Sequence, residues 1–96
     1  MSARDAYMKK IEAEIELAQA KLVELKASAK VSAADARIKY ERLIDDLEQL
    51  LDDTKTKLKE LGSSSDDAWG ELKDGVESVW ADFKTGLGKM TAKLHS

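Results

Sequence analysis

The side chains that most often carry out catalysis are scarce in this chain of 96 residues. His95 is the only histidine, and it stands one position before the end, where chains are usually disordered. There is no cysteine, which excludes disulfides, thiolate metal ligands and cysteine nucleophiles. Without a second histidine or a cysteine, one chain cannot assemble a nucleophile–base pair or an ordinary zinc or copper site. The Glu-x-x-His signature of di-iron bundles is also absent, since no acidic residue precedes His95 by three. We therefore expect no catalytic residue, no metal site and no cofactor.

Three acidic pairs suggest a calcium or magnesium site: Asp45-Asp46, Asp52-Asp53 and Asp66-Asp67. Adjacent residues on a helix point about 100° apart, so the two carboxylates of a pair do not converge on one ion. The Asp-x-Asp-x-Asp-Gly loop of a calcium site is absent as well. We interpret these residues as a solvated helix face, with i,i+4 ion pairs predicted for Asp53–Lys57, Asp35–Lys39 and Arg37–Glu41.

The composition is typical of helical bundles and coiled coils, with 36% charged and 5% aromatic residues. The formal net charge of −3 argues against general binding to nucleic acids. Seven charged residues in the first twenty exclude a secretory signal, and no stretch approaches the roughly 20 apolar residues of a spanning helix. We expect a cytoplasmic protein with a single helical domain over residues 1–96.

Apolar residues recur by threes and fours along most of the chain, which predicts helices with one apolar stripe. The first stripe comprises Met8, Ile11, Ile15, Ala18, Leu22, Leu25 and Ala29. The second comprises Ala36, Tyr40, Leu43, Leu47, Leu50 and Thr54, followed after a one-position shift by Leu58 and Leu61. Such stripes must be buried against other helices, so the predicted fold is an all-α antiparallel helical bundle or coiled coil.

The clearest helix boundary is the stretch 62–65. Gly62 suits the left-handed position that ends many helices, and Ser63–Ser65 offer N-cap oxygens for a following helix. Ser64 and Asp67 have the spacing of a capping box. We predict a turn at 62–65 and an amphipathic helix over 66–94 that returns antiparallel.

A second boundary, within residues 27–35, is ambiguous. Ser32 and Asp35 also have capping-box spacing, and a break near Ser32 would give a three-helix bundle. However, this segment is rich in alanine and has no glycine or proline, so nothing local forces a turn. The alternative is one long helix over about 3–61 plus a returning helix over about 65–94. The long helix would span ~88 Å and would need a partner chain to cover its N-terminal half. We favour the long helix, and with it a dimer.

The last third contains both tryptophans and the only phenylalanine. Trp69 and Trp80 are eleven residues apart, three helical turns, so both face the same way, towards the core or towards a docking surface. The segment Gly86–Gly88 is where we expect this helix to fray. Its basic end is compatible with adsorption to a membrane surface, which the acidic residues earlier in the helix disfavour. The basic residues are Lys84, Lys89 and Lys93, and the acidic ones are Asp74, Glu77 and Asp82.

Several segments resemble one family of short bacterial proteins. They are Ser2-Ala3-Arg4-Asp5-Ala6-Tyr7, Ala33-Ala34-Asp35-Ala36 with Tyr40, Leu58-Lys59-Glu60-Leu61 and, most specifically, the run from Ser65-Asp66-Asp67-Ala68-Trp69 to Val79-Trp80. This combination is similar to the small coiled-coil domain-containing stress-response proteins of cyanobacteria and proteobacteria. The resemblance implies a cytoplasmic, non-enzymatic helical protein linked to stress, and it supplies no catalytic residues.

We therefore predict a non-enzymatic protein that acts by helix association, as a stress-related scaffold or protective protein. The expected partner is a second copy of the chain, in a homodimer or larger assembly, or an unidentified protein, and not nucleic acid. The predicted packed seam comprises Leu43, Leu47, Leu50, Trp69, Val76, Trp80 and Phe83. If the long helix forms, the oligomer interface comprises Met8, Ile11, Ile15, Leu22 and Leu25. The alternative function is lipid association at a membrane surface by an opened amphipathic bundle.

Overall fold

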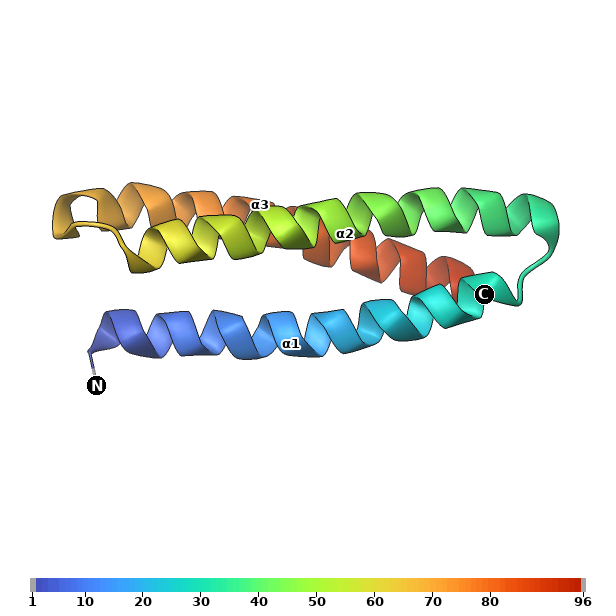
Figure 1. The fold of residues 1–96 in the computed structure, drawn as a ribbon, viewed down its shortest axis with the longest axis horizontal. Coiled ribbons are helices and arrows are strands. Elements are labelled where there is room, and N and C mark those ends of the chain that lie inside the picture. The colour runs from blue at the N-terminus through green and yellow to red at the C-terminus, as the bar shows by residue number, and fades with distance from the viewer. Residues whose placement is uncertain (1, 96) are drawn as a thin grey trace.

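The computed structural model describes residues 2–95, without the side chain of His95, and contains three α-helices (Figure 1). They are α1 (Ala3–Lys30), α2 (Ala34–Gly62) and α3 (Asp66–His95). Successive helices run antiparallel, so α1 and α3 point the same way, and the bundle is 50 Å long and 20 by 17 Å across. The predicted all-α class is confirmed, and of the two proposed architectures the chain adopts the three-helix bundle.

The favoured long helix over 3–61 is wrong, because α1 ends at Lys30 and the chain turns over residues 31–33. The turn lets the stripe of α1 pack against α2 and α3 of the same chain, where Leu25 and Ala29 are completely buried. Helix propensity favours alanine by only fractions of a kcal/mol per residue, whereas burying a leucine side chain stabilises by about 1.5–3 kcal/mol. Burial of the stripe therefore decides the break, although no glycine or proline marks it.

The turn between α1 and α2 differs from the predicted capping box. The Ser32 hydroxyl donates to the backbone oxygen of Ser28 at 3.3 Å, so it closes α1 and does not cap α2. The residue preceding α2 is Ala33, whose side chain cannot accept a hydrogen bond. Its backbone oxygen accepts from the N–H of Arg37 at 2.8 Å, which is the first hydrogen bond of the helix.

The turn between α2 and α3 lies where the sequence predicts it, but its details differ. Gly62 is the last residue of α2, and no glycine within residues 2–95 has a positive φ. The Ser64 hydroxyl donates to the backbone oxygen of Leu61 at 2.7 Å. The cap of α3 is Ser65, whose hydroxyl oxygen accepts from the N–H of Ala68 at 3.3 Å. The predicted left-handed glycine and the Ser64 capping box are therefore wrong, whereas the boundary is right.

The core runs along the centre of the bundle, and α2 and α3 share the most extensive contact, with α1 packed less extensively on both. On α2 the buried residues are Ile44, Leu47, Leu51, Thr54, Leu58 and Leu61. The predicted Leu43 and Leu50 are half-buried at the edge of this row, so the centre of the stripe lies one position further along the chain. Thr54 is fully buried, and its hydroxyl donates to the backbone oxygen of Leu50 at 2.8 Å, which satisfies its polar group.

The predicted fraying over Gly86–Gly88 is not present, since α3 continues to His95. Gly86 lies where α3 approaches α2 closely, and a Cβ atom added to it would lie 2.7 Å from Cδ2 of Leu47. A Cβ added to Gly88 would meet no atom within 4 Å. Gly86 is therefore a packing residue, and of these two glycines only Gly88 carries the weakening expected of an exposed helix glycine.

Candidate functional site

The twelve predicted packing and interface residues all contribute to the interior of one chain. Eight are buried, namely Ile11, Ile15, Leu22, Leu25, Leu47, Val76, Trp80 and Phe83. Four are partly buried and pack against this core, namely Met8, Leu43, Leu50 and Trp69. The prediction that five α1 residues form an oligomer interface depended on the long helix. In the three-helix bundle these residues pack against α2 and α3 of the same chain. A surface for association must therefore lie on the outside of this closed bundle.

The two tryptophans occupy different environments. Trp80 is 5% exposed and stacks on Phe83, with ring centroids 5.2 Å apart and ring planes 10° from parallel. Its indole N–H has no hydrogen-bond partner among the described residues. Trp69 is half-buried, and its ring and that of Tyr7 on α1 form a T-shaped pair with ring centroids 5.9 Å apart. Packing within the chain accounts for the position of both rings.

An N-terminal cluster attaches the start of α1 to the turn between α2 and α3. The Arg4 guanidinium lies 4.4 Å from the centroid of the Trp69 ring and donates to the backbone oxygen of Ser64 at 2.8 Å. It also pairs with Asp66 at 2.8 Å, but that carboxylate is 95% exposed, so water weakens the ion pair. The cation–π contact and the hydrogen bond to the backbone hold α1 at this end.

Tyr7 belongs to the same cluster and has a perturbed acidity. Its hydroxyl donates to Oε1 of Glu77 at 3.3 Å, and the ammonium of Lys73 lies 4.9 Å from the centroid of its ring. Burial, followed by the negative charge of Glu77, raises the pKa of Tyr7 from 10.0 to about 12. Both causes favour the neutral phenol, so the contact with Glu77 is a hydrogen bond of the protonated tyrosine.

The acidic pairs lie on exposed or half-exposed helix faces, as predicted. Arg37 and Glu41 form the predicted ion pair at 3.8 Å, while Asp53 accepts a hydrogen bond from Gln49 at 3.2 Å. Within the described part of the chain, no three acidic, histidine or cysteine side chains gather as metal ligands would. None of the helices described is long and apolar enough to cross a membrane.

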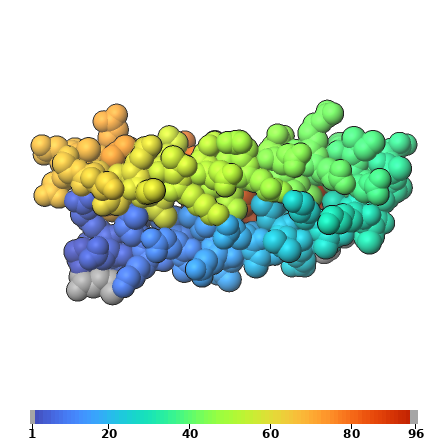
Figure 2. All heavy atoms as spheres, in the orientation of Figure 1, coloured from blue at the N-terminus to red at the C-terminus, as the bar shows by residue number. Residues whose placement is uncertain are grey.

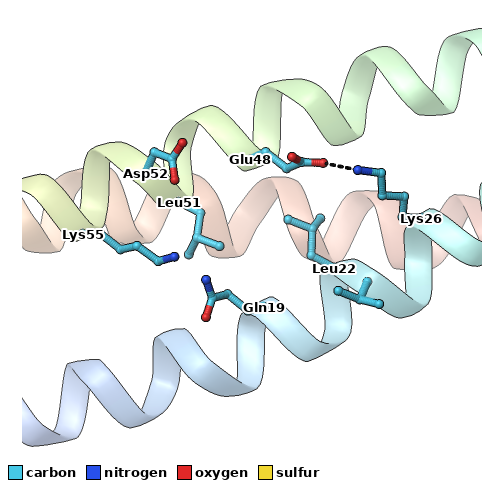
Figure 3. Close-up of a pocket in the computed structure, with 8 residues that line it drawn as sticks. Gln19, Leu22, Lys26, Glu48, Leu51, Asp52 and Lys55 are labelled. Atoms are coloured by element: carbon cyan, nitrogen blue, oxygen red, sulfur yellow. Dashed lines mark hydrogen bonds and ion pairs between the residues drawn. The ribbon is translucent and has the colours of Figure 1, made fainter.

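The main hollow of the surface is a groove between α1 and α2, which face the viewer in Figure 2. Its floor is apolar and consists of Met8, Ile15, Leu22, Leu51 and Leu58. Near the N-terminal half of α1 the groove encloses about 560 Å³. Further along, Figure 3 shows Gln19 of α1 and Lys55 of α2 extending towards each other across the space between the helices.

Charges of alternating sign line this groove. In its first half, Glu12 and Glu16 of α1 lie opposite Lys55 and Lys59 of α2. In its second half the signs are reversed, with Lys26 on α1 opposite Glu48 and Asp52 on α2. We call these seven charged residues the groove rim. Their pattern is its own complement after rotation by 180° about the long axis of the groove.

The two halves of the groove rim differ in how well their charges are paired. Lys26 and Glu48 form an ion pair at 3.2 Å, drawn in Figure 3. Among the described residues, no ion pair joins Glu12 or Glu16 to Lys55 or Lys59. In the first half, the charges on the two sides of the groove are therefore not paired with each other, and an occupant with the same charge pattern could pair with them.

The groove rim could not be recognised from the sequence, because its charged residues on two helices become neighbours only after α1 folds back. The available signal was that acidic residues precede basic ones in both segments of the sequence. On α1 Glu12 and Glu16 precede Lys26, and on α2 Glu48 and Asp52 precede Lys55 and Lys59. Because the two helices are antiparallel, this order places opposite charges across the groove. Comparisons of the chain with protein-family models, with curated proteins and with solved structures find no match. The functional argument therefore depends on the geometry of the bundle.

Proposed function

We propose that this protein acts without catalysis, by association of helical bundles, and that the surface for association is the groove between α1 and α2. The proposed occupant is the same groove of a second copy, so that two bundles lie face to face. The observation that carries the proposal is the groove rim, whose charges are self-complementary and whose first half is unpaired within one chain.

The proposed pairing follows from a twofold axis along the groove. Rotation about this axis puts α1 of one bundle over α2 of the other, at the same level along the groove. Glu12 and Glu16 then face the lysines 55 and 59 of the partner, and each such contact occurs twice. Complementary charges of this kind set the register of an interface and suppress wrong partners.

The size of the surface is compatible with a stable dimer. Viewed down its shortest axis, the bundle measures 50 by 20 Å, and α1 and α2 lie side by side on this face (Figure 1). A standard interface buries ~800 Å² on each partner, which would cover most of that face. The apolar surface to be removed from water belongs to Val23, which is 68% exposed, and to the partly buried Met8, because the other floor residues are at most 5% exposed.

The test is sedimentation equilibrium on two charge-reversal variants, Lys55→Glu/Lys59→Glu and Glu12→Lys/Glu16→Lys. The wild type should be a dimer, and each variant alone should be a monomer, because each then faces like charges across the interface. An equimolar mixture of the two variants should form the heterodimer, since the acidic groove of one matches the basic groove of the other.

A matched control is Lys9→Glu/Lys10→Glu, which makes the same change in charge at exposed positions of α1 outside the groove. It should leave the dimer intact. A wild type that stays monomeric, or a mixture that fails to form the heterodimer although both variants keep their helical circular dichroism, would contradict the proposal.

We also propose, from the resemblance of Ser65–Trp80, that the protein belongs with the bacterial stress-response proteins and works in the cytoplasm as a scaffold or protective protein. The experiment is to follow its abundance in the source cell during heat, osmotic and oxidative stress, with fractionation of the cell. An abundance that does not change under any of these stresses would contradict this role.

A further inference from the structure

The end of the bundle formed by the turn between α1 and α2 has an unusual apolar surface. Val31, in the turn itself, is 87% exposed, and Ile38, in the second turn of α2, is 61% exposed. Helical side chains lean towards the N-terminus of their helix, so Ile38 leans towards the same end as Val31. Ala33 and Ala34 between them are exposed too. These residues present aliphatic groups to solvent at the extremity of the molecule.

Most of the charged residues at this end of the bundle are basic. We define the basic tip as residues 30–42 together with 89–94, the last turns of α3, which end at the same end of the bundle (Figure 1). Its six cations are all exposed, namely Lys30, Arg37, Lys39, Arg42, Lys89 and Lys93. Its two anions are Asp35 and Glu41, so its side chains carry a net charge of +4.

The rest of the molecule is acidic. The whole chain carries −3, so the residues outside the basic tip carry −7. Two of these anions, Asp45 and Asp46, follow residues 30–42 on α2, and Asp46 lies beside Lys89 and Lys93 on the flank of the bundle. The bundle is 50 Å long, several times the electrostatic screening length of ~8 Å at physiological salt. The acidic residues at the far end therefore do not repel an anionic surface that lies against the basic tip.

We infer that the basic tip docks end-on to a membrane surface rich in anionic lipid, with Val31 and Ile38 inserted between the headgroups. Cations near an anionic leaflet favour adsorption, and exposed aliphatic side chains favour insertion. The aliphatic groups favour lipid over nucleic acid, whose surface offers phosphates to the cations and nothing comparable to Val31. The bundle stays closed in this arrangement, and the groove between α1 and α2 remains free.

The experiment measures binding of the full chain to vesicles of equimolar phosphatidylglycerol and phosphatidylcholine, by co-sedimentation. The wild type should bind these vesicles and not vesicles of phosphatidylcholine alone. Lys39→Glu/Arg42→Glu should weaken binding at least about 25-fold, since each lost cation costs about fivefold and the anionic surface also repels the new carboxylates. Val31→Ser/Ile38→Ser should weaken it about tenfold, through the lost insertion of aliphatic groups.

Each variant has a control that makes the same chemical change elsewhere. Lys9→Glu/Lys10→Glu changes the net charge by the same amount as Lys39→Glu/Arg42→Glu, but in the N-terminal half of α1, away from the basic tip. Leu17→Ser removes one aliphatic side chain, 74% exposed, from the flank of the bundle away from the groove between α1 and α2, and its counterpart is Ile38→Ser alone. Both controls should bind like the wild type. If a control loses as much binding as its partner, the attraction is general and the assignment to the basic tip is overturned.

The position of the contact can be measured directly, because the chain contains no cysteine. A nitrobenzoxadiazole label on Val31→Cys should shift its emission to the blue on adding the anionic vesicles, and the same label on Leu17→Cys should not. The tryptophan emission should stay unchanged, because Trp80 is buried inside a bundle that remains closed. A shift at Leu17 or Trp80 would mean that the bundle opens on the lipid, and absence of binding to anionic vesicles would also overturn the inference.

Discussion

Replacing Gly86 with alanine tests the closest approach between α2 and α3. In an exposed helix interior, the change from glycine to alanine stabilises a protein by about 0.5–1 kcal/mol. We expect that full gain for Gly88→Ala, whose added methyl group meets nothing within 4 Å. At Gly86 the methyl carbon would lie 2.7 Å from Cδ2 of Leu47, a side chain that is 4% exposed, so Leu47 must move.

The difference in stability between Gly86→Ala and Gly88→Ala follows from the contact of the added methyl group with Leu47. Moving a leucine off its preferred rotamer costs about 0.5–1.5 kcal/mol. This cost offsets the gain in helix propensity, so Gly86→Ala should change the free energy of unfolding by between about −1 and +0.5 kcal/mol. A change of 1 kcal/mol corresponds to a shift in Tm of about 4–8 °C for a domain of this size. Gly88→Ala should therefore melt several degrees above Gly86→Ala.

The assay is urea and thermal unfolding followed by far-UV circular dichroism, for both variants and for each of them in a Leu47→Met background. Methionine is unbranched and can yield to the added methyl group, so the penalty at Gly86 should shrink in that background while the gain at Gly88 stays the same. Equal stabilisation by Gly86→Ala and Gly88→Ala in the wild-type background would refute the close approach of the two helices.

The remaining predictions concern the N-terminal cluster. In a Tyr40→Phe background, absorbance titration should give a pKa of about 12 for Tyr7, and Glu77→Gln should lower that pKa, because it removes the second largest cause of the shift. The pKa of Tyr7 in the folded state lies above the unfolded value of 10.0. The stability that Tyr7 contributes is therefore fully present below pH 10 and is lost as the pH rises towards 12. A Tyr7 contribution to stability that increases between pH 10 and pH 12 would contradict the assignment. Arg4→Ala should lower the free energy of unfolding by about 1 kcal/mol and shift the emission of Trp69 to the red, and unchanged values for both would show that the cation–π contact is unimportant.

Local patterns in the sequence were sufficient for the class of fold and for one of the two turns. The apolar stripes predicted helices, and the run of glycine and serines at 62–65 predicted the second turn. The first turn could not be settled in this way, because the energy that breaks the helix comes from contacts of Leu25 and Ala29 with residues far away in the chain. Gly86 was misread for the same reason, since a glycine at a helix crossing and a glycine in a fraying helix have the same local sequence.

The groove rim and the basic tip were still harder to predict from the sequence, because they exist only after the chain has folded. Glu12 and Lys59 are 47 positions apart in the sequence, and only the turn at 31–33 brings their helices together. The same turn exposes Val31 at the end of the bundle to which the basic tip belongs. In the sequence, the acidic residues of 66–94 argued against a basic surface, but in the bundle Asp74 and Glu77 precede the last turns of α3 and lie outside the basic tip.

Small-angle scattering of the wild-type protein on an absolute scale tests the central claim most directly, because it gives mass and length together. We expect twice the chain mass of 10.6 kDa and a maximum dimension close to the 50 Å length of one bundle, since pairing through the groove adds thickness and not length. A particle of 10.6 kDa would contradict pairing, and a particle near ~90 Å long would contradict the closed three-helix bundle in favour of a continuous helix.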